Sequence, residues 1–169
     1  GNLLKDKTVG IIGCGRIGTY VAKLVNAFDC NIVGYDPFIT KHDICKMIPF
    51  DELISSADII TMHMPFTEEN RHMIGREQLS KMKKTAILIN TARGGLVDED
   101  ALYDALKSGQ IAGAALDCFE NEPYEGPLTT LDNVVLAAHM GASAVEGRAI
   151  MERQAFDNLV NELKAQGLI

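Results

Sequence analysis

The sequence lacks tryptophan, and aromatic residues make up only 6% of its 169 residues. It has no apolar run near the roughly 18 residues that a membrane-spanning helix needs, and no signal-peptide pattern. It has no C-x-x-C pair, and its cysteines are too few for a disulfide scaffold; they are Cys14, Cys30, Cys45 and Cys118. These absences predict a soluble, cytoplasmic protein with buried reduced thiols and no membrane partner.

Positive charge is also scarce. The chain has 16 Lys and Arg against 23 Asp and Glu, a net charge of −7, which argues against nucleic acid as a partner. His42, His63 and His72 show no ligand-like spacing with cysteines or carboxylates, so we expect no metal site. Apolar residues, by contrast, reach 47%, enough for one sizeable core, so we expect residues 1–169 to form a single domain.

A glycine motif follows the first apolar run. Thr8–Ile12 is β-branched and apolar, which predicts a buried strand, and it leads directly into a G-x-G-x-x-G motif before a helical period. Gly13 permits the tight strand-to-helix turn, Gly15 lets the backbone approach a pyrophosphate, and Gly18 lets helix and strand pack closely. The helix N-terminus offers N–H groups and a positive dipole end to the phosphates.

An acidic residue completes this unit. Asp36 ends a second predicted strand, Asn31–Tyr35, where its carboxylate can accept hydrogen bonds from both ribose hydroxyls and repel a 2′-phosphate. Glycine-rich loops alone are common, so the motif by itself is weak. The strand before it, the helix after it and the acid at this distance together predict NAD binding rather than NADP binding.

The remaining chain alternates predicted strands with predicted helices. We expect an irregular or short helical connection over 39–47, a helical turn capped by Asp51, and a helix over 99–107 capped by Asp98. A capping box of Ser143 and Glu146 should open a long final helix. The expected strands are 58–64, 85–90, 111–116 and 133–137. This alternation predicts an α/β fold, a doubly wound parallel sheet of the Rossmann type with right-handed crossovers.

Ligands bind such sheets outside the carboxyl ends of the strands, and polar residues gather there in this sequence. Arg93 follows a strand, and its guanidinium suits bidentate capture of a carboxylate, although it could be a surface cation. His139 also follows a strand and could donate a proton, or it could be structural. Glu122 is a solvated loop residue unless it reaches His139.

These motifs resemble the D-isomer-specific 2-hydroxyacid dehydrogenase family over nearly the whole chain. The resemblance is carried by residues 9–18, 90–99, 115–123 and 139–143. The arginine and glutamate-proline motifs are more specific than the glycine loop. The His-x-Gly-Ala-Ser ending leans toward the 3-phosphoglycerate dehydrogenase branch, with glyoxylate or hydroxypyruvate reductases and D-lactate dehydrogenases as alternatives. Ala138 departs from the proline that the family usually has, which could change how rigidly His139 is aimed.

The resemblance implies a site and a reaction. Arg93 would hold the substrate carboxylate, His139 would act as acid and base on the substrate oxygen, and Glu122 would pair with it. A hydride would pass between substrate C2 and the nicotinamide of NAD. The implied cofactor contacts are Gly13, Gly15, Arg16, Ile17, Gly18, Asp36, Met64, Thr91, Ala92, Arg93, Asp117, His139, Gly141 and Ala142.

The resemblance also bears on what the chain contains. Family members wrap a substrate domain around this cofactor domain, so residues 1–169 are expected to be the NAD-binding domain without the substrate domain, and homodimeric in the parent enzyme. Such a chain would bind NAD and turn over its 2-hydroxyacid poorly.

Two other functions compete with this interpretation. C-terminal-binding-protein corepressors resemble the family but carry a tryptophan beyond the histidine, which this chain lacks. A domain that binds S-adenosylmethionine fits poorly with Gly18 and the Arg93, Glu122 and His139 set.

Overall fold

The computed structural model describes residues 2–169. The chain divides into a first unit that ends at Ala138 and a second unit, His139–Ile169. The first unit contains every strand and all helices but one, and it is described first.

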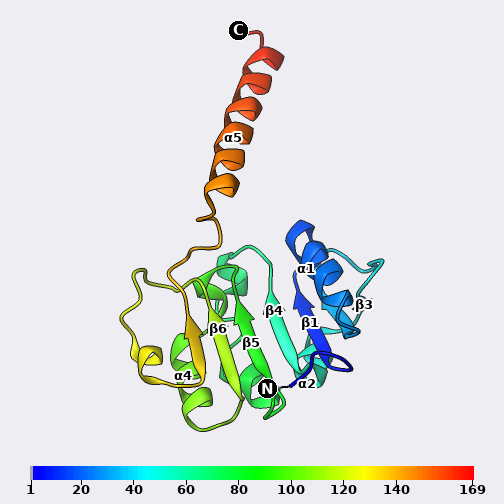
Figure 1. Cartoon of the computed structure of the whole chain (residues 1–169), viewed down its shortest axis with the longest axis vertical. Coiled ribbons are helices and arrows are strands. Elements are labelled where there is room, and N and C mark those ends of the chain that lie inside the picture. The colour runs from blue at the N-terminus through cyan, green and yellow to red at the C-terminus, as the bar shows by residue number, and fades with distance from the viewer. Residues whose placement is uncertain (1) are drawn as a thin grey trace. The chain divides into compact units, whose positions relative to one another are not determined.

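A single parallel sheet organises the first unit (Figure 1). Its order is β3-β2-β1-β4-β5-β6-β7, so the chain runs outward from β1 in one direction and then returns to continue from β1 in the other. The strands are β1 (Thr8–Ile12), β2 (Asn31–Tyr35), β3 (Lys46–Met47), β4 (Ile59–Met62), β5 (Ile87–Asn90), β6 (Gly113–Leu116) and β7 (Val134–Leu136). The reversal beside β1 is the switch point at which ligands bind in sheets of this kind.

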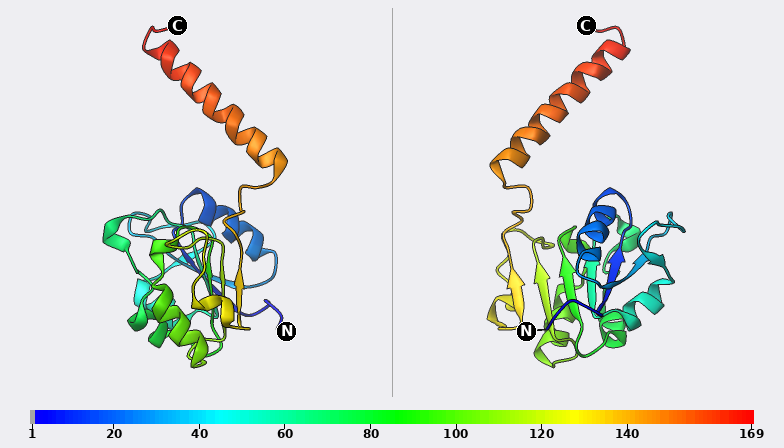
Figure 2. Two further views of the ribbon diagram at one scale, coloured as in Figure 1. Left: turned by 90° about the vertical axis from the view of Figure 1, so that its left-hand side faces the viewer. Right: turned by 45° about the vertical axis from the view of Figure 1, so that its right-hand side comes forward.

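Helices cover both faces of this sheet, as the turned views in Figure 2 show. The α1 helix packs on one face around Val9, Ile11 and Ala22, whereas α2, α3 and α4 share a larger apolar core on the other. The helices of the first unit are α1 (Arg16–Asn26), α2 (Phe50–Ser56), α3 (Arg76–Lys81) and α4 (Glu99–Lys107), with 3-10 turns η1 (Glu68–Asn70), η2 (Gly94–Leu96) and η3 (Pro127–Thr130). The predicted doubly wound α/β fold is therefore confirmed.

The register of the sheet brings the strand ends to one edge. Ile12 of β1 pairs with the last residue of both neighbours, β2 and β4. Asn90 of β5 likewise pairs with Met62 of β4 and with Leu116 of β6. The residues that follow these strands consequently start from the same level of the sheet, which is what a shared site needs.

Two local predictions for the first unit were wrong. Segment 39–47 is not wholly irregular, because β3 adds to the sheet edge through Val33 and Gly34 of β2. Asp51 does not cap α2, which begins one residue earlier behind Pro49. By contrast, Asp98 caps α4 as predicted, since its carboxylate accepts a hydrogen bond of 2.9 Å from Ala101 N–H.

The second unit consists of a turn and the helix α5 (Val145–Ala165). The predicted capping box is absent among these described residues, because the helix begins behind Ala144 with no side-chain cap. Glu146 therefore lies one position too early to reach back to the cap. Several apolar side chains of α5, including Ile150 and Phe156, are more than half exposed. No helix described in residues 2–169 is long and apolar enough to cross a membrane.

Asp58 stabilises the edge of the sheet at which the strands begin, opposite the edge formed by their carboxyl ends. Its carboxylate accepts hydrogen bonds of 2.9 Å from Thr8 N–H and 2.9 Å from Lys83 Nζ. Burial opposes its ionisation, but the Thr8 hydrogen bond and the Lys83 ion pair outweigh burial and hold the pKa of Asp58 below its usual value. The charged Asp58 side chain therefore links β1 to β4, the strand that begins directly after Asp58.

We expect Asp58→Ala to lower the free energy of unfolding by about 1–3 kcal/mol at neutral pH, because the partly buried N–H of Thr8 and the Lys83 cation lose their acceptor. A carboxyl with a lowered folded pKa stabilises above its unfolded pKa, so the difference should vanish as the pH falls below about 4. Urea unfolding at neutral and acid pH measures this, with the exposed Asp132→Ala as the control. Equal stability of the two variants at pH 7 would contradict the role of Asp58.

Candidate functional site

The turn between β1 and α1 admits only glycine at two positions. Gly13 has a φ of 91°, and a Cβ there would lie 2.7 Å from both His63 C and Met64 N. A Cβ on Gly18 would collide with the carbonyl oxygen of Gly13. No described atom lies within 4 Å of the place where a Cβ of Gly15 would sit, so this backbone remains open to a ligand.

The N-terminus of α1 faces the same opening. Its first intrahelical hydrogen bond runs from Thr19 N–H to Gly15 O over 2.9 Å, so the N–H groups of Arg16, Ile17 and Gly18 have no intrahelical acceptor. No side chain in the described chain caps this helix end. Backbone donors at a helix N-terminus fit the pyrophosphate of a dinucleotide.

Asp36 lies beside this helix end and organises the loop around it. Its Oδ2 accepts a hydrogen bond of 2.9 Å from Cys14 N–H, and its Oδ1 accepts bonds from Phe38 N–H at 2.9 Å and Ile39 N–H at 3.1 Å. A carboxylate has about four acceptor positions, so ribose hydroxyls can still be bound. Asp36 therefore also positions the glycine loop, a role that its place in the sequence did not reveal.

A histidine that sequence reasoning left aside supports the same loop. His42 Nδ1 accepts hydrogen bonds from Ile44 N–H (3.2 Å) and Cys45 N–H (3.1 Å), so its proton is on Nε2. That Nε2 donates to Thr19 Oγ1 over 3.0 Å, and Thr19 Oγ1 donates to Cys14 O over 3.2 Å. Sequence analysis missed this contact of His42 with the glycine loop because His42 lies far from the motif in the sequence.

The loop after β5 is shaped by a buried amide. Asn90 is 1% exposed, and its side chain donates 2.8 Å to Arg93 O and accepts 3.1 Å from Ala92 N–H. Thr91 and Arg93 are exposed as a result. The guanidinium of Arg93 donates to Ala92 O over 2.6 Å and otherwise faces solvent, so it is accessible to an anionic ligand.

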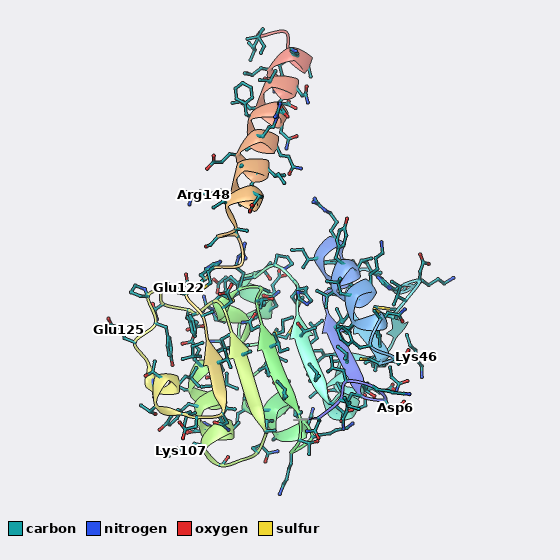
Figure 3. All side chains as sticks on the ribbon, in the orientation of Figure 1. Asp6, Lys46, Lys107, Glu122, Glu125 and Arg148 are labelled. Atoms are coloured by element: carbon teal, nitrogen blue, oxygen red, sulfur yellow. The ribbon has the colours of Figure 1, made fainter. Side chains whose placement is uncertain are left out.

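The charges of Arg93, Asp117 and Glu122 all act on the buried thiol of Cys118. Burial, together with the carboxylates of Glu122 and Asp117, raises the pKa of Cys118 to about 11, and the Arg93 cation acts against this shift. Glu122 accepts a hydrogen bond of 3.0 Å from Phe119 N–H, which folds the loop back on itself. Figure 3 shows Glu122 near the carboxyl edge of the sheet, opposite Lys107 at the other edge. Three predicted site residues thus lie close enough to one buried thiol for their charges to shift its pKa.

The end of β4 contributes backbone and a neutral imidazole. His63 N–H donates 2.7 Å to Ile12 O, and its Nε2 lies 3.0 Å from Thr61 Oγ1. Burial lowers the pKa of His63, so it is neutral at pH 7. Met64, the predicted cofactor contact, follows it and is half-buried. No group of three or more His, Cys, Asp or Glu in the described chain is placed to hold a metal ion.

The other predicted site residues belong to the second unit. His139 is exposed and has a φ of 51°, a left-handed conformation that histidine adopts more readily than most side chains. Gly141 and Ala142 follow in a turn. The pairing of His139 with Glu122 therefore stays a prediction.

The reactivity of Cys118 reports on its charged neighbours. Glu122→Gln should lower the pKa of this thiol and speed its alkylation by about fivefold, because one nearby charge contributes about 1 kcal/mol in a partly solvated site. Arg93→Gln should slow it by a similar factor. Peptide mapping after iodoacetamide treatment at pH 9 gives both rates, with the remote Glu125→Gln as control. Unchanged alkylation rates in both variants would show that the charges of Glu122 and Arg93 do not act on Cys118.

Comparison with known proteins agrees with this geometry. The D-isomer specific 2-hydroxyacid dehydrogenase, NAD binding domain family matches residues 1–141. D-3-phosphoglycerate dehydrogenase of Methanocaldococcus jannaschii is 53% identical over 151 residues, 86% of this chain and 29% of that protein. Glyoxylate reductase of Thermofilum pendens is 48% identical over 171 residues, 96% of this chain and 50% of that protein. The chain therefore spans half or less of these relatives.

A solved structure of similar fold is the NAD-complexed D-isomer specific 2-hydroxyacid dehydrogenase of Lactobacillus delbrueckii ssp. bulgaricus. Its TM-score is 0.89 at 33% identity, over 96% of this chain and 55% of that chain. The glycine turn, the open N-terminus of α1 and the Asp36 carboxylate fit the dinucleotide that this family binds. The chain therefore belongs to the D-isomer specific 2-hydroxyacid dehydrogenase family and carries its NAD-binding domain.

Proposed function

We propose that this domain binds NAD and supplies the catalytic residues of an enzyme that interconverts a D-2-hydroxyacid and its 2-ketoacid. The observation that carries the proposal is the convergence of Arg93, Asp117 and Glu122 around Cys118, at the edge where α1 presents its open N-terminus. An exposed guanidinium and two carboxylates beside a dinucleotide cradle fit a reaction that binds an anion and moves a proton.

Each residue has a separate task in this proposal. NAD, when bound, supplies the hydride acceptor or donor. Arg93 holds the substrate carboxylate and polarises the reacting carbonyl, and His139 gives or takes the proton of the substrate oxygen. Glu122 orients His139, and Asp117 lies near the nicotinamide. Asp36 holds the adenosine ribose, while Gly13, Gly15, Arg16, Ile17, Gly18, Met64, Thr91, Ala92, Gly141 and Ala142 complete the cofactor contacts.

For the substrate, we propose 3-phosphoglycerate, with glyoxylate or hydroxypyruvate as the alternative. The His-x-Gly-Ala-Ser sequence at His139 and the 53% identity to a D-3-phosphoglycerate dehydrogenase support the first. The 48% identity to a glyoxylate reductase supports the second. The contacts that distinguish these acids would lie on a substrate-binding domain, so residues 1–169 form the NAD-binding domain alone and turn over substrate poorly in our proposal.

We further propose that the parent enzyme is a cytoplasmic homodimer. Four free cysteines support a reducing compartment. An apolar stripe on one face of α1 supports the dimer, because its side chains are more than half exposed and recur at helical spacing. The stripe consists of Ile17, Tyr20 and Leu24 of α1, continued by Phe28 just beyond the end of the helix. A second copy of this domain is the occupant that would cover it.

A second candidate is a binding module that reports the NAD state. The same catalytic set occurs in the C-terminal-binding-protein corepressors that the chain resembles, so the set does not separate the two functions. The absence of tryptophan argues for the enzyme. Turnover of a 2-ketoacid by the parent protein separates the two.

Calorimetric titration of the chain with NADH and with NADPH tests the cofactor site. We expect NADH to bind at least about 100-fold more tightly, because the Asp36 carboxylate repels a 2′-phosphate and juxtaposed like charges cost several kcal/mol. Asp36→Asn should lower the ratio of NADH affinity to NADPH affinity. Asp132→Asn, which lies far from the loop, should leave this ratio unchanged. Comparable binding of both dinucleotides by the unaltered chain would overturn the role of Asp36, and binding of neither would overturn the site.

Kinetics of the full-length parent enzyme test the reaction. Arg93→Ala should lower kcat/KM for the ketoacid by about 100-fold or more, the effect of losing charge-assisted hydrogen bonds worth about 3 kcal/mol. Arg76→Ala, which removes an exposed arginine paired with Asp104, is the matched control. Phosphohydroxypyruvate, hydroxypyruvate and glyoxylate are compared as substrates with NADH. Unaltered kcat/KM in Arg93→Ala would refute its role.

A further inference from the structure

Two cysteines from distant parts of the sequence pack against the same glycine of β2. The position that a Cβ of Gly34 would take lies 2.7 Å from Cys14 Sγ and 3.0 Å from Cys45 Cβ. Met47 Sδ lies 2.9 Å from the same point. Since Gly34 has no side chain, the two cysteines fill one small space between the glycine loop and the segment that precedes β3.

The two thiols of this pair affect each other's ionisation. Cys14 Sγ lies 3.7 Å from Ile11 O and 3.9 Å from Tyr35 O. The neighbouring Cys45 thiol and burial raise the pKa of Cys14, whereas the neighbouring Cys14 thiol lowers the pKa of Cys45 against the effect of its burial. Cys45 is therefore the better nucleophile and Cys14 the proton-bearing partner.

An open cavity approaches this pair from the side of Cys14. Cys14 and Cys45 are only 2% and 4% exposed, which excludes proteins and large thiol reagents. Cys14, however, lines a cavity of about 620 Å³ between the start of α1 and residues 39–44. Hydrogen peroxide is scarcely larger than water and fits such a cavity with ease.

We propose that Cys14 and Cys45 form a peroxide-sensitive modification site, in which their oxidation to a disulfide weakens the binding of NADH to this domain. Disulfides in reducing compartments are usually transient and regulatory, and this pair has the proximity that such use requires. Cys30 and Cys118 lie apart from it and keep their thiols.

The chemistry balances with peroxide as the oxidant. The Cys45 thiolate attacks one oxygen of hydrogen peroxide, the O–O bond breaks, and the departing hydroxide takes a proton to become water while Cys45 becomes a sulfenic acid. Cys14 then attacks the Cys45 sulfur, and its proton leaves with the hydroxyl group as a second water. The two thiols lose two electrons, and the peroxide gains them. A dithiol reductant reverses the change.

Disulfide formation reaches the cofactor site through the backbone. An S–S bond of about 2.05 Å holds the two Cβ atoms about 3.8 Å apart, and both cysteine side chains are packed tightly against Gly34, so we expect the backbone at Cys14 or Cys45 to move when the bond forms. Cys14 N–H binds Asp36, and Cys14 O accepts from Thr19. Cys45 N–H binds His42, which donates to that same Thr19. Movement at either cysteine therefore disturbs the loop that holds the pyrophosphate.

The experiment treats the reduced chain with hydrogen peroxide and maps its peptides by mass spectrometry. We expect one disulfide, between Cys14 and Cys45, with Cys30 and Cys118 still alkylated as thiols. NADH affinity of the oxidised protein should fall by about tenfold, the loss expected when one charge-assisted hydrogen bond is misaligned, and dithiothreitol should restore it. By linkage, saturating NADH should hinder disulfide formation.

Variants separate this effect from general oxidation. In Cys45→Ser the affinity for NADH should no longer respond to peroxide, whereas Cys30→Ser should respond as the unaltered chain does. Cys45→Ala replaces Cys45→Ser if the serine variant does not fold. The peptide map of the unaltered chain tests disulfide formation without any variant. Absence of the Cys14–Cys45 disulfide, or its formation with unchanged NADH affinity, would overturn the proposal. A reduced chain that fails to bind NADH would instead count against the cofactor site.

Discussion

The contact between Gly18 of α1 and the carbonyl oxygen of Gly13 is the constraint on which the site depends. No side chain fits there, so α1 starts close against the end of β1 and its unpaired N–H groups point into the opening. Asp36 then joins this turn to the end of β2 through Cys14. Cys14, in the same turn, packs beside Cys45 against Gly34, so the cofactor site and the cysteine pair share backbone atoms.

A second group of contacts places the chemical residues. The buried Asn90 side chain holds the backbone of residues 92 and 93, and Cys118 is the neutral packing residue around which Arg93, Asp117 and Glu122 gather. Neither Asn90 nor Cys118 needs to touch a substrate to matter. Asn90 and Cys118 help to position an exposed arginine and two carboxylates at the edge of the sheet where ligands bind.

Prediction from sequence succeeded where the signal is local. The glycine spacing, the Asp98 cap, and the strands β1 and β2 depend on neighbouring residues. The structure confirms the two strands and the cap. It failed at β3, whose two residues form a strand only because β2 offers a free edge, and at the start of α5.

The sequence by itself determined the fold class, the dinucleotide motif and the family, because periodicity, glycine positions and motif order are properties of the linear chain. Only the tertiary structure decided that His42 supports the glycine loop, that Asn90 shapes the arginine loop, and that Cys14 meets Cys45. His42 and Thr19 lie 23 positions apart, and Cys14 and Cys45 also come from separate segments, so no local pattern encodes these two contacts. The Asn90 contacts are close in sequence but depend on how the loop after β5 folds. At Cys14 and Cys45, packing against Gly34 created the contact, since the absence of a side chain there lets distant atoms meet.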